Sequence, residues 1–323
     1  MLVAVGLAAL AGLAGLWLFW DRPDLEAAGL PVAAAAGSAE GVRVTWLGVT
    51  TLLFDDGETR LLTDGFFSRP GLLDVFLDRE VEPDVESIER QLAAAGIDRL
   101  AAVMTVHSHF DHAMDTGEVA RRTGAVVLGS ASTANLARGA GLPEDRIVVM
   151  GAGGGSRRFG RFEVAFLPSR HAPIDGGQPP FPGRVDAPLV PPAPVSAWRE
   201  GGSFSIVIRH PRAAFLVQGS AGFVEGALDG VRVDAVLLGV GALSRLGRGY
   251  AETYWDEIVG RTGARRVFLV HWDDFTRPFG DLRPAPRFFD DVEQSLGWLS
   301  GRAAAASPPV RIERLPFAEA VAF

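Results

Sequence analysis

The chain contains the stretch Leu100-Ala-Ala-Val-Met-Thr-Val106, which runs directly into His107-Ser108-His109-Phe110-Asp111-His112. An apolar run such as 100–106 is typical of a strand that is buried on both faces. Histidines two positions apart on an extended chain point to the same side, so His107 and His109 can reach one cation. Asp111 and His112 follow where a turn can offer a carboxylate and a third imidazole to a neighbouring site. The stretch predicts a metal site at the end of a buried strand.

Two further histidines follow apolar strands in the same way. His171 comes after the predicted strand at 162–167, and His271 comes after the one at 267–270. Open α/β sheets bind ligands at the carboxyl ends of their strands, so we expect both side chains to ligate metal. Residues 272–275 follow the last ligand and are candidates for lining the site. His210 lies between two predicted strands and is interpreted as a solvated loop residue.

The composition restricts the chemistry of such a site. The 323 residues include six histidines and no cysteine, so thiolate ligands and cysteine nucleophiles are excluded. Every basic residue is arginine, which excludes Schiff-base chemistry on lysine. A net charge of −8 disfavours nucleic acid as a partner, because an acidic surface repels phosphates. The remaining donors are imidazole and carboxylate, a set that suits zinc.

The rest of the main domain, 42–323, alternates strands and helices and predicts a layered α/β fold. Residues 172–202 hold eight of the 21 prolines and no periodic pattern, so they are interpreted as a loop insertion, either functional or disordered. Tyr254 and Trp255 are expected in the core. The predicted strands are 42–47, 51–54, 60–63, 100–106, 125–128, 147–150, 162–167, 204–208, 214–218, 235–239, 267–270 and 310–315, and the predicted helices are 85–95, 131–138, 251–260 and 286–299.

The first 20 residues carry no charged side chain. A helix of that length spans about 30 Å, the thickness of a bilayer core, and Trp17 and Trp20 end it where interfacial aromatics belong. The expectation is therefore a transmembrane anchor at 1–20, a linker at 21–41 and a membrane-anchored, extracytoplasmic catalytic domain. A cleaved signal segment that yields a secreted form, and a buried core helix, are the alternatives.

The cluster His107-x-His109-x-Asp111-His112, with the later His171 and His271, resembles the metallo-β-lactamase superfamily. Val44-Thr45-Trp46-Leu47-Gly48 and Leu61-Leu62-Thr63-Asp64 are similar to the opening of its lactonase-like and N-acyl phosphatidylethanolamine phospholipase D-like branch. The resemblance covers about residues 42–315 and implies a four-layer αββα sandwich. It implies that His107, His109 and His171 hold one metal, and that Asp111, His112 and His271 hold a second.

The chain departs from this pattern at one position. The family usually places an aspartate that bridges both metals after a strand between the third and last histidines, and here Ser220 stands at that place. A neutral hydroxyl is a poor bridging ligand, so the second metal should bind more weakly. The expectation is one or two zinc ions. Asp64 and Asp273 are the candidates for a compensating carboxylate.

These features predict a zinc-dependent hydrolase in which metal-activated water attacks an ester, a lactone or a phosphodiester in a small-molecule or lipid-like substrate. Asp111 is the candidate catalytic residue, because it would position that water and carry its proton. One alternative is a β-lactamase or a glyoxalase II-type thioesterase. Another is a membrane-tethered metal- or ligand-binding protein in which Ser220 has reduced or abolished catalysis.

Overall fold

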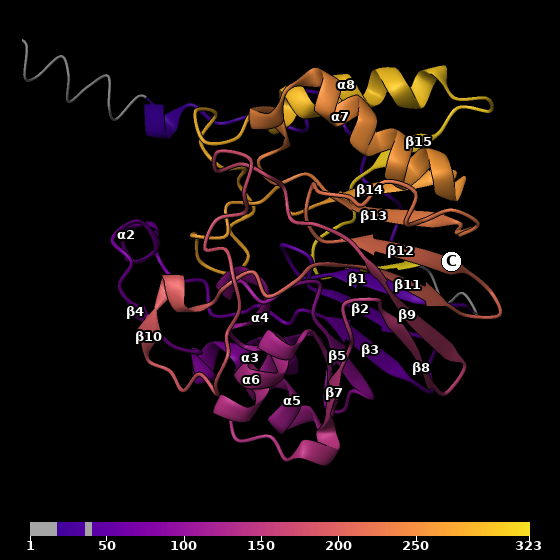
Figure 1. Ribbon diagram of the computed structural model, residues 1–323. Coiled ribbons are helices and arrows are strands. Elements are labelled where there is room, and N and C mark those ends of the chain that lie inside the picture. Colours follow the sequence, from indigo (N-terminus) through magenta and orange to yellow (C-terminus); the bar gives the residue numbers. More distant parts are fainter. Residues whose placement is uncertain (1–17, 36–40) are drawn as a thin grey trace, which may run out of the picture.

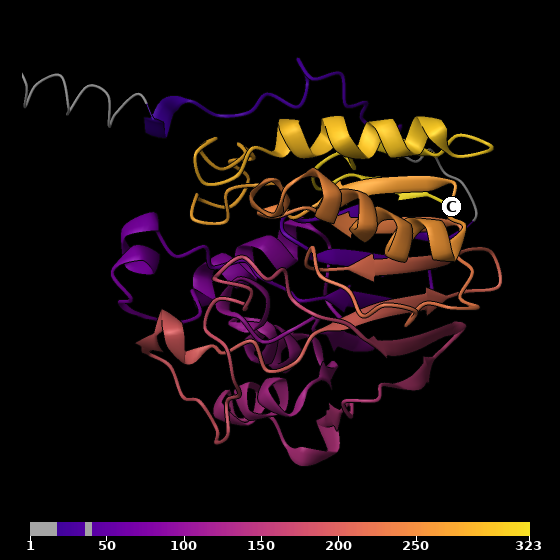
Figure 2. The ribbon, with the colours of Figure 1, turned by 45° about the horizontal axis from the view of Figure 1, so that its top comes forward.

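The computed structural model describes residues 18–35 and 41–323 and shows two facing sheets covered by helices on their outer sides (Figures 1 and 2). The first sheet has the strand order β16-β1-β2-β3-β5-β6-β7. Its strands are β1 (Arg43–Trp46), β2 (Leu52–Asp55), β3 (Arg60–Thr63), β5 (Ala102–Met104), β6 (Val126–Gly129), β7 (Ile147–Val149) and β16 (Ala320–Ala322).

The second sheet has the order β15-β14-β13-β12-β11-β9-β8. Its strands are β8 (Gly155–Phe159), β9 (Phe162–Pro168), β11 (Phe204–Arg209), β12 (Ala214–Gln218), β13 (Ala235–Gly239), β14 (Arg266–Val270) and β15 (Arg311–Glu313). Each sheet pairs four strands antiparallel and continues with parallel ones, β3-β5-β6-β7 in the first and β12-β13-β14-β15 in the second. The two halves of the chain therefore form sheets of the same plan.

Helices occupy both outer faces, as an αββα sandwich requires. Near the first sheet lie α3 (Val85–Ala94), α5 (Thr116–Thr123) and α6 (Ala131–Gly139), and near the second lie α7 (Arg248–Trp255) and α8 (Val292–Ala305) (Figure 1). A π-helical turn at Asp256–Gly260 continues α7. Two short helices, α2 (Leu72–Phe76) and α4 (Phe110–Ala113), and a small sheet of β4 (Glu80–Val81) with β10 (Ala193–Pro194) lie at one end. The layered α/β prediction is confirmed.

Strand β5 shows why the sequence before the histidines is apolar throughout. Ala102 and Met104 belong to the core between the sheets, whereas Val103 belongs to the core under α3 and α5. Successive side chains of a strand point to opposite faces, so a central strand of this sandwich has no polar face. Between the sheets, Phe54 of β2 meets Phe215 of β12 with ring centroids 5.3 Å apart.

The predicted element boundaries are mostly correct, and the differences have local causes. The last long helix begins at Val292, not at 286, because Asp291 caps it by accepting a hydrogen bond from the Gln294 backbone N–H. Strands β8 and β16 and helix α5 were not predicted. Tyr254 and Trp255 are buried, as expected for core residues.

The structure does not support the predicted transmembrane anchor at residues 1–20. Within residues 18–35 and 41–323, no helix has the length and apolar character needed to cross a membrane. Residues 1–17 of that segment lie outside the described residues. The same finding gives no support to the membrane-anchored localisation that was predicted with the anchor.

The described residues that follow the segment are bound to the main domain. Arg22 forms an ion pair of 2.8 Å with Asp274, and Leu25 and Leu30 are each 4% exposed and belong to the main hydrophobic core. Val32 forms a β-bridge with Arg314. Burial of these two leucines gives residues 18–35 a fixed course over the domain.

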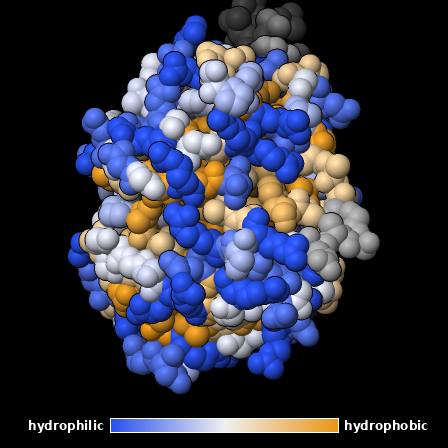
Figure 3. Space-filling view, turned by 90° about the vertical axis from the view of Figure 1, so that its right-hand side faces the viewer, coloured by the Kyte–Doolittle hydropathy of each residue, from blue (hydrophilic) through white to orange (hydrophobic). Residues whose placement is uncertain are grey.

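The end of the molecule that carries the C-terminus has an ordinary surface. Hydrophilic side chains cover most of it, with smaller hydrophobic areas between them (Figure 3). Apolar atoms contribute much of any protein surface, so scattered hydrophobic areas of this kind are normal.

We expect the Phe54–Phe215 contact to hold the two sheets together. Phe215→Ala should lower the free energy of unfolding by about 3–5 kcal/mol, because it removes a fully buried ring from the core. Denaturant unfolding followed by circular dichroism measures this change. Phe76→Ala is the matched control, because Phe76 is 74% exposed and its truncation should cost about 0.5 kcal/mol or less. Equal losses in both variants would contradict the assignment of the core.

Candidate metal centre

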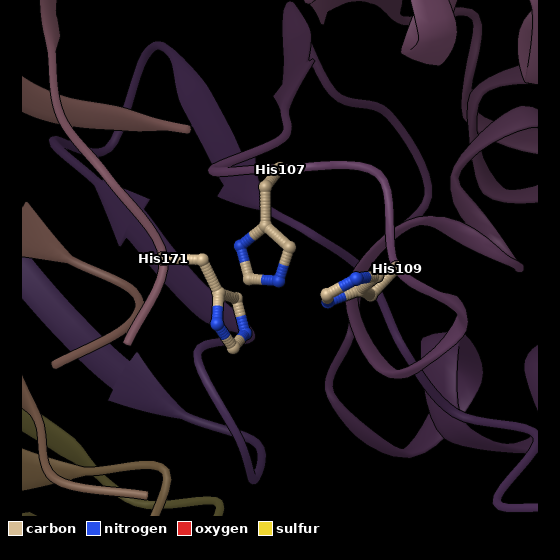
Figure 4. A group of neighbouring side chains, drawn as sticks. All are labelled: His107, His109 and His171. Carbon is tan, nitrogen blue, oxygen red and sulfur yellow. The ribbon is translucent and has the colours of Figure 1, made fainter. Parts of the chain in front are cut away.

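Three imidazoles meet at one edge of the sandwich. His107 and His109 lie on the segment that follows β5, and His171 lies just after β9, so both sheets contribute to the group (Figure 4). One nitrogen from each ring lies within 4.8 Å of the corresponding nitrogens of the others. His107 is 1% exposed and His109 is 4% exposed. This first ligand group matches the size of a site for one metal ion.

A second ligand group lies beside the first. Asp111, His112 and His271 also bring one ligand atom each to within 4.8 Å of one another. Asp111 Oδ2 is 3.4 Å from His112 Nε2 and 3.3 Å from His271 Nε2. The rings of His107 and His112 have centroids 4.0 Å apart, so the two groups are adjacent. The structure thus brings together all six residues proposed as ligands.

Hydrogen bonds to the far side of each ring fix which nitrogen faces the group. His109 Nε2 and His171 Nδ1 each lie 2.8 Å from a backbone carbonyl oxygen, those of Pro180 and Ala172. His112 Nδ1 lies 2.8 Å from Asp64 Oδ2. A ring N–H that donates in this way leaves the other nitrogen with its lone pair for a metal. The presented atoms are therefore His109 Nδ1, His171 Nε2 and His112 Nε2.

The nitrogens that face the centre fit a metal. Both ring nitrogens of His107, and Nε2 of His112, are buried without a hydrogen-bond partner among the described residues. Buried polar atoms in proteins are almost always satisfied, so unpartnered nitrogens within the two ligand groups indicate a ligand that completes them. The donor set of imidazole and carboxylate, without thiolate, is suited to zinc and related divalent ions.

Burial and mutual repulsion keep the first ligand group neutral. Burial, together with the neighbouring imidazoles, holds the pKa of His107 well below its usual value and lowers that of His171 to about 3. Burial also lowers the pKa of His109. Metal ions bind the deprotonated imidazole, so these shifts favour metal binding at neutral pH.

The second ligand group carries the negative charge. Burial alone would raise the pKa of Asp111, but the His112 and His271 imidazoles outweigh burial and lower it, which keeps the carboxylate ionised. Burial likewise acts to lower the pKa of His112, yet Asp111 and Asp64 together raise it. A cation bound in this group would interact favourably with the same ionised carboxylate that the two imidazoles stabilise.

The two carboxylates considered as substitutes for a bridging aspartate have other partners. Asp64 accepts hydrogen bonds from Thr50 Oγ1 and from the backbone N–H of Val106, in addition to its contact with His112. Asp273 forms a buried ion pair of 2.9 Å with Arg69 and accepts a hydrogen bond from the Val49 N–H. Both therefore support the residues around the site instead of facing its centre.

Ser220 also has a structural role. Its hydroxyl oxygen accepts a hydrogen bond of 3.0 Å from the backbone N–H of Ala172, next to the ligand His171. Gln218 Nε2 donates to the Ser220 carbonyl oxygen at 2.9 Å and fixes the same turn. The residue at the place of the usual bridging aspartate thus positions the chain around His171.

The structure places the remaining candidates as follows. Residues 272–275 all line the pocket above the ligand groups. His210 lies far from them, and its side chain is only 2% exposed, with Nε2 3.4 Å from Asp56. The interpretation of His210 as solvated is wrong, because its ring packs against Phe162 at a centroid distance of 5.0 Å.

Several residues around the site were not found from the sequence. Thr50 lies 3.0 Å from His112 Nδ1, and α2 and Arg245 border the pocket. The backbone at Asp64 and His271 has a positive φ of 55° in each case, a conformation that costs energy for these residue types and often occurs at functional sites. No motif in the sequence signals these long-range contacts.

The facing sheets, the outer helices and the two ligand groups at one edge support the resemblance of this chain to the metallo-β-lactamase superfamily. No family model matches the sequence. A UPF0173 metal-dependent hydrolase of Agrobacterium fabrum is 30% identical over 131 residues, which are 41% of this chain and 48% of the relative. A UPF0173 metal-dependent hydrolase of Pyrobaculum calidifontis is 24% identical over 140 residues, which are 43% of this chain and 55% of that relative.

The chain therefore spans about half the length of the curated relatives it matches. Among solved structures, CmlA, a diiron β-hydroxylase from Streptomyces venezuelae, superposes with a TM-score of 0.50 at 15% identity. The superposition covers 89% of this chain and 55% of CmlA. At this identity the likeness shows the fold alone.

We expect the first ligand group to retain metal only with its full set of imidazoles. His107→Ala should abolish tight metal binding at this group, because it removes the ligand at its centre. Metal content after dialysis, measured by inductively coupled plasma mass spectrometry, tests this. His210→Ala is the matched control and should keep the wild-type metal content. Undiminished metal in His107→Ala would show that the ion binds elsewhere.

Ser220→Asp should strengthen the binding of a second metal ion by about tenfold, because it restores an anionic ligand at this position. A chelator competition titration of the purified protein gives the two stepwise affinities. Ser220→Asn has nearly the same size without the charge and should leave the second affinity weak. Equal second affinities in the two variants would refute the charge argument.

Proposed function

We propose that this protein is a metal-dependent hydrolase that uses metal-activated water against an ester, a lactone or a phosphodiester. The observation that carries the proposal is the pair of ligand groups, because four of their members line a pocket of about 320 Å³: His109, Asp111, His171 and His271. A concave, largely apolar pocket with a few convergent polar groups is the usual form of an active site. The relatives described as metal-dependent hydrolases support the same reading.

Zinc is the metal that we propose for the first ligand group. Three imidazoles from His107, His109 and His171 leave one position of a tetrahedral site open, which is the arrangement of catalytic zinc sites. A divalent ion supplies Lewis acidity there: it makes water nucleophilic near neutral pH and polarises the group under attack. The remaining steps belong to the side chains and the pocket.

Asp111 orients the attacking water in this proposal. Its carboxylate lies within 3.3–3.4 Å of His112 and His271 and is the anionic acceptor at the junction of the two ligand groups. Its lowered pKa keeps it ionised and therefore able to accept a hydrogen bond from the water and then its proton. The contact between Asp64 and His112 holds the neighbouring ring in place.

The walls of the pocket keep other water away from the reacting group. Phe110, Phe181 and Phe275 line it beside the ligands, and Phe110 and Phe275 meet with ring centroids 5.9 Å apart. A dry surrounding strengthens the electrostatic interactions of the ligands with substrate and excludes competing nucleophiles. Ser220 also lines this pocket but offers no charge to it.

Asp111→Asn should lower kcat by about 10²–10⁴-fold on any ester, lactone or phosphodiester that the wild type hydrolyses, because the amide cannot accept the proton. Steady-state kinetics with matched chromogenic substrates of the three classes, on zinc-loaded protein, measure the effect. Asp186→Asn, at an exposed loop position, is the control and should keep the wild-type rate.

Two results would contradict the proposed function. Wild-type zinc protein that turns over none of the three substrate classes, while it binds metal tightly, would favour a metal- or ligand-binding protein. Hydrolysis of a chromogenic β-lactam or of a glutathione thioester, with no hydrolysis of the three classes, would favour the β-lactamase or thioesterase alternative.

A further inference from the structure

The pocket above the ligand groups has mostly apolar walls that come from four separate segments. Helix α2 contributes Leu72, Val75 and Phe76, α4 contributes Phe110, and the proline-rich segment contributes Ile174 and Phe181. The segment after β14 adds further apolar side chains, among them Trp272 and Phe289. Phe76 is 74% exposed and Phe289 is 37% exposed, so apolar surface extends to the rim. Such walls favour a substrate with an apolar body.

Three acidic residues outside the ligand groups also line this pocket, and each already has partners. Asp273 is paired with Arg69 at 2.9 Å, and Asp274 is paired with Arg22 at 2.8 Å. Asp290 accepts hydrogen bonds from the Ala242 N–H at 2.8 Å and from Ser244 Oγ at 2.7 Å. These carboxylates are satisfied and have no need of a ligand.

Arg245 differs from these residues. It lies on a short 3₁₀-helix, Leu243–Leu246, and is the one basic side chain in the lining of this pocket among the described residues. Its guanidinium has no hydrogen bond or ion pair with any residue in the part of the chain that the structure describes, and it is exposed. By contrast, Arg248 on the next turn is paired with Glu252 at 2.7 Å.

We propose that Arg245 selects the substrate: it binds a carboxylate on a molecule whose apolar body fills the pocket and whose scissile group faces the ligand groups. This assignment deepens the proposed hydrolase function and rests on it for the reaction, though not for the binding. The guanidinium fork matches the two oxygens of a carboxylate. A single arginine in a lining that also contains four aspartates, Asp111 among them, balances one negative charge, which favours a monoanionic carboxylate over a phosphate dianion.

The kinetic test compares esters that differ only in a distal carboxylate. Nitrophenyl monoesters of linear diacids with four to ten carbons are compared with nitrophenyl esters of the corresponding monoacids, on zinc-loaded protein. For the best chain length, Arg245→Gln should raise KM about tenfold for the carboxylated ester and leave kcat and the neutral ester unchanged. Arg248→Gln is the matched control and should leave both substrates unchanged.

A binding measurement separates this inference from the proposed function. Isothermal titration calorimetry with suberate and octanoate compares two probes of the same chain length that differ by one carboxylate. The wild type should bind suberate about tenfold more tightly than octanoate, and Arg245→Gln should lose this preference while Arg248→Gln keeps it.

Each outcome decides one of the two proposals. A preference for suberate that depends on Arg245, in a protein that hydrolyses no substrate, supports the role of Arg245 and overturns the hydrolase. Hydrolysis with equal affinities for the two acids, or with a preference that survives Arg245→Gln, overturns the role of Arg245 and leaves the hydrolase standing. Failure to bind either acid also overturns the role of Arg245.

Discussion

Five imidazoles, three buried and two partly buried, meet at one edge of the sandwich, and this is the constraint on which the rest of the site depends. A buried ring needs a partner for each nitrogen, because an unsatisfied polar atom in an apolar surrounding costs free energy. Here the partner on the far side of His109 is the carbonyl oxygen of Pro180, and that of His171 is the adjacent carbonyl of Ala172. The proline-rich segment must therefore fold back over the ligands, which explains why so long a loop has a defined course.

Charged residues that are not ligands themselves surround the ligand groups and hold them in place. Asp64 ties His112 to Thr50 and to the backbone at Val106, so one buried carboxylate connects β3, β5 and the second ligand group. On the other side, the Arg69–Asp273 pair lies against Gly48, where a Cβ would come within 2.0 Å of Arg69 Nη2. Breaking such a buried pair leaves an uncompensated charge, so these residues position the ligands without touching the metal.

The local part of the site could be predicted from the sequence, and the long-range part could not. His107, His109, Asp111 and His112 are close in sequence, and His171 and His271 directly follow apolar strands, so strand geometry alone placed them near one edge. The contacts of Ser220 with Ala172, and of Arg22 with Asp274, join residues that only the folded chain brings together. His210 was misjudged because a turn between strands is usually solvated, whereas Phe162 and Asp56 cover it here.

The proposed metal ligands and the residues that form the pocket walls lie in different parts of the fold. The ligands lie on α4 or on short segments that follow β5, β9 and β14, and the positions of these strands are set by the two sheets and the core between them. The ligands therefore tolerate little displacement. The pocket walls come from α2, the proline-rich segment and the residues after β14, which are connections that can change without disturbing the sheets. Ser220 lies between these two parts of the fold. It follows a core strand, and its hydroxyl stabilises the turn next to His171. A replacement there alters the charge at the ligand groups while the apolar walls stay the same, so metal affinity and substrate choice can vary independently in this fold.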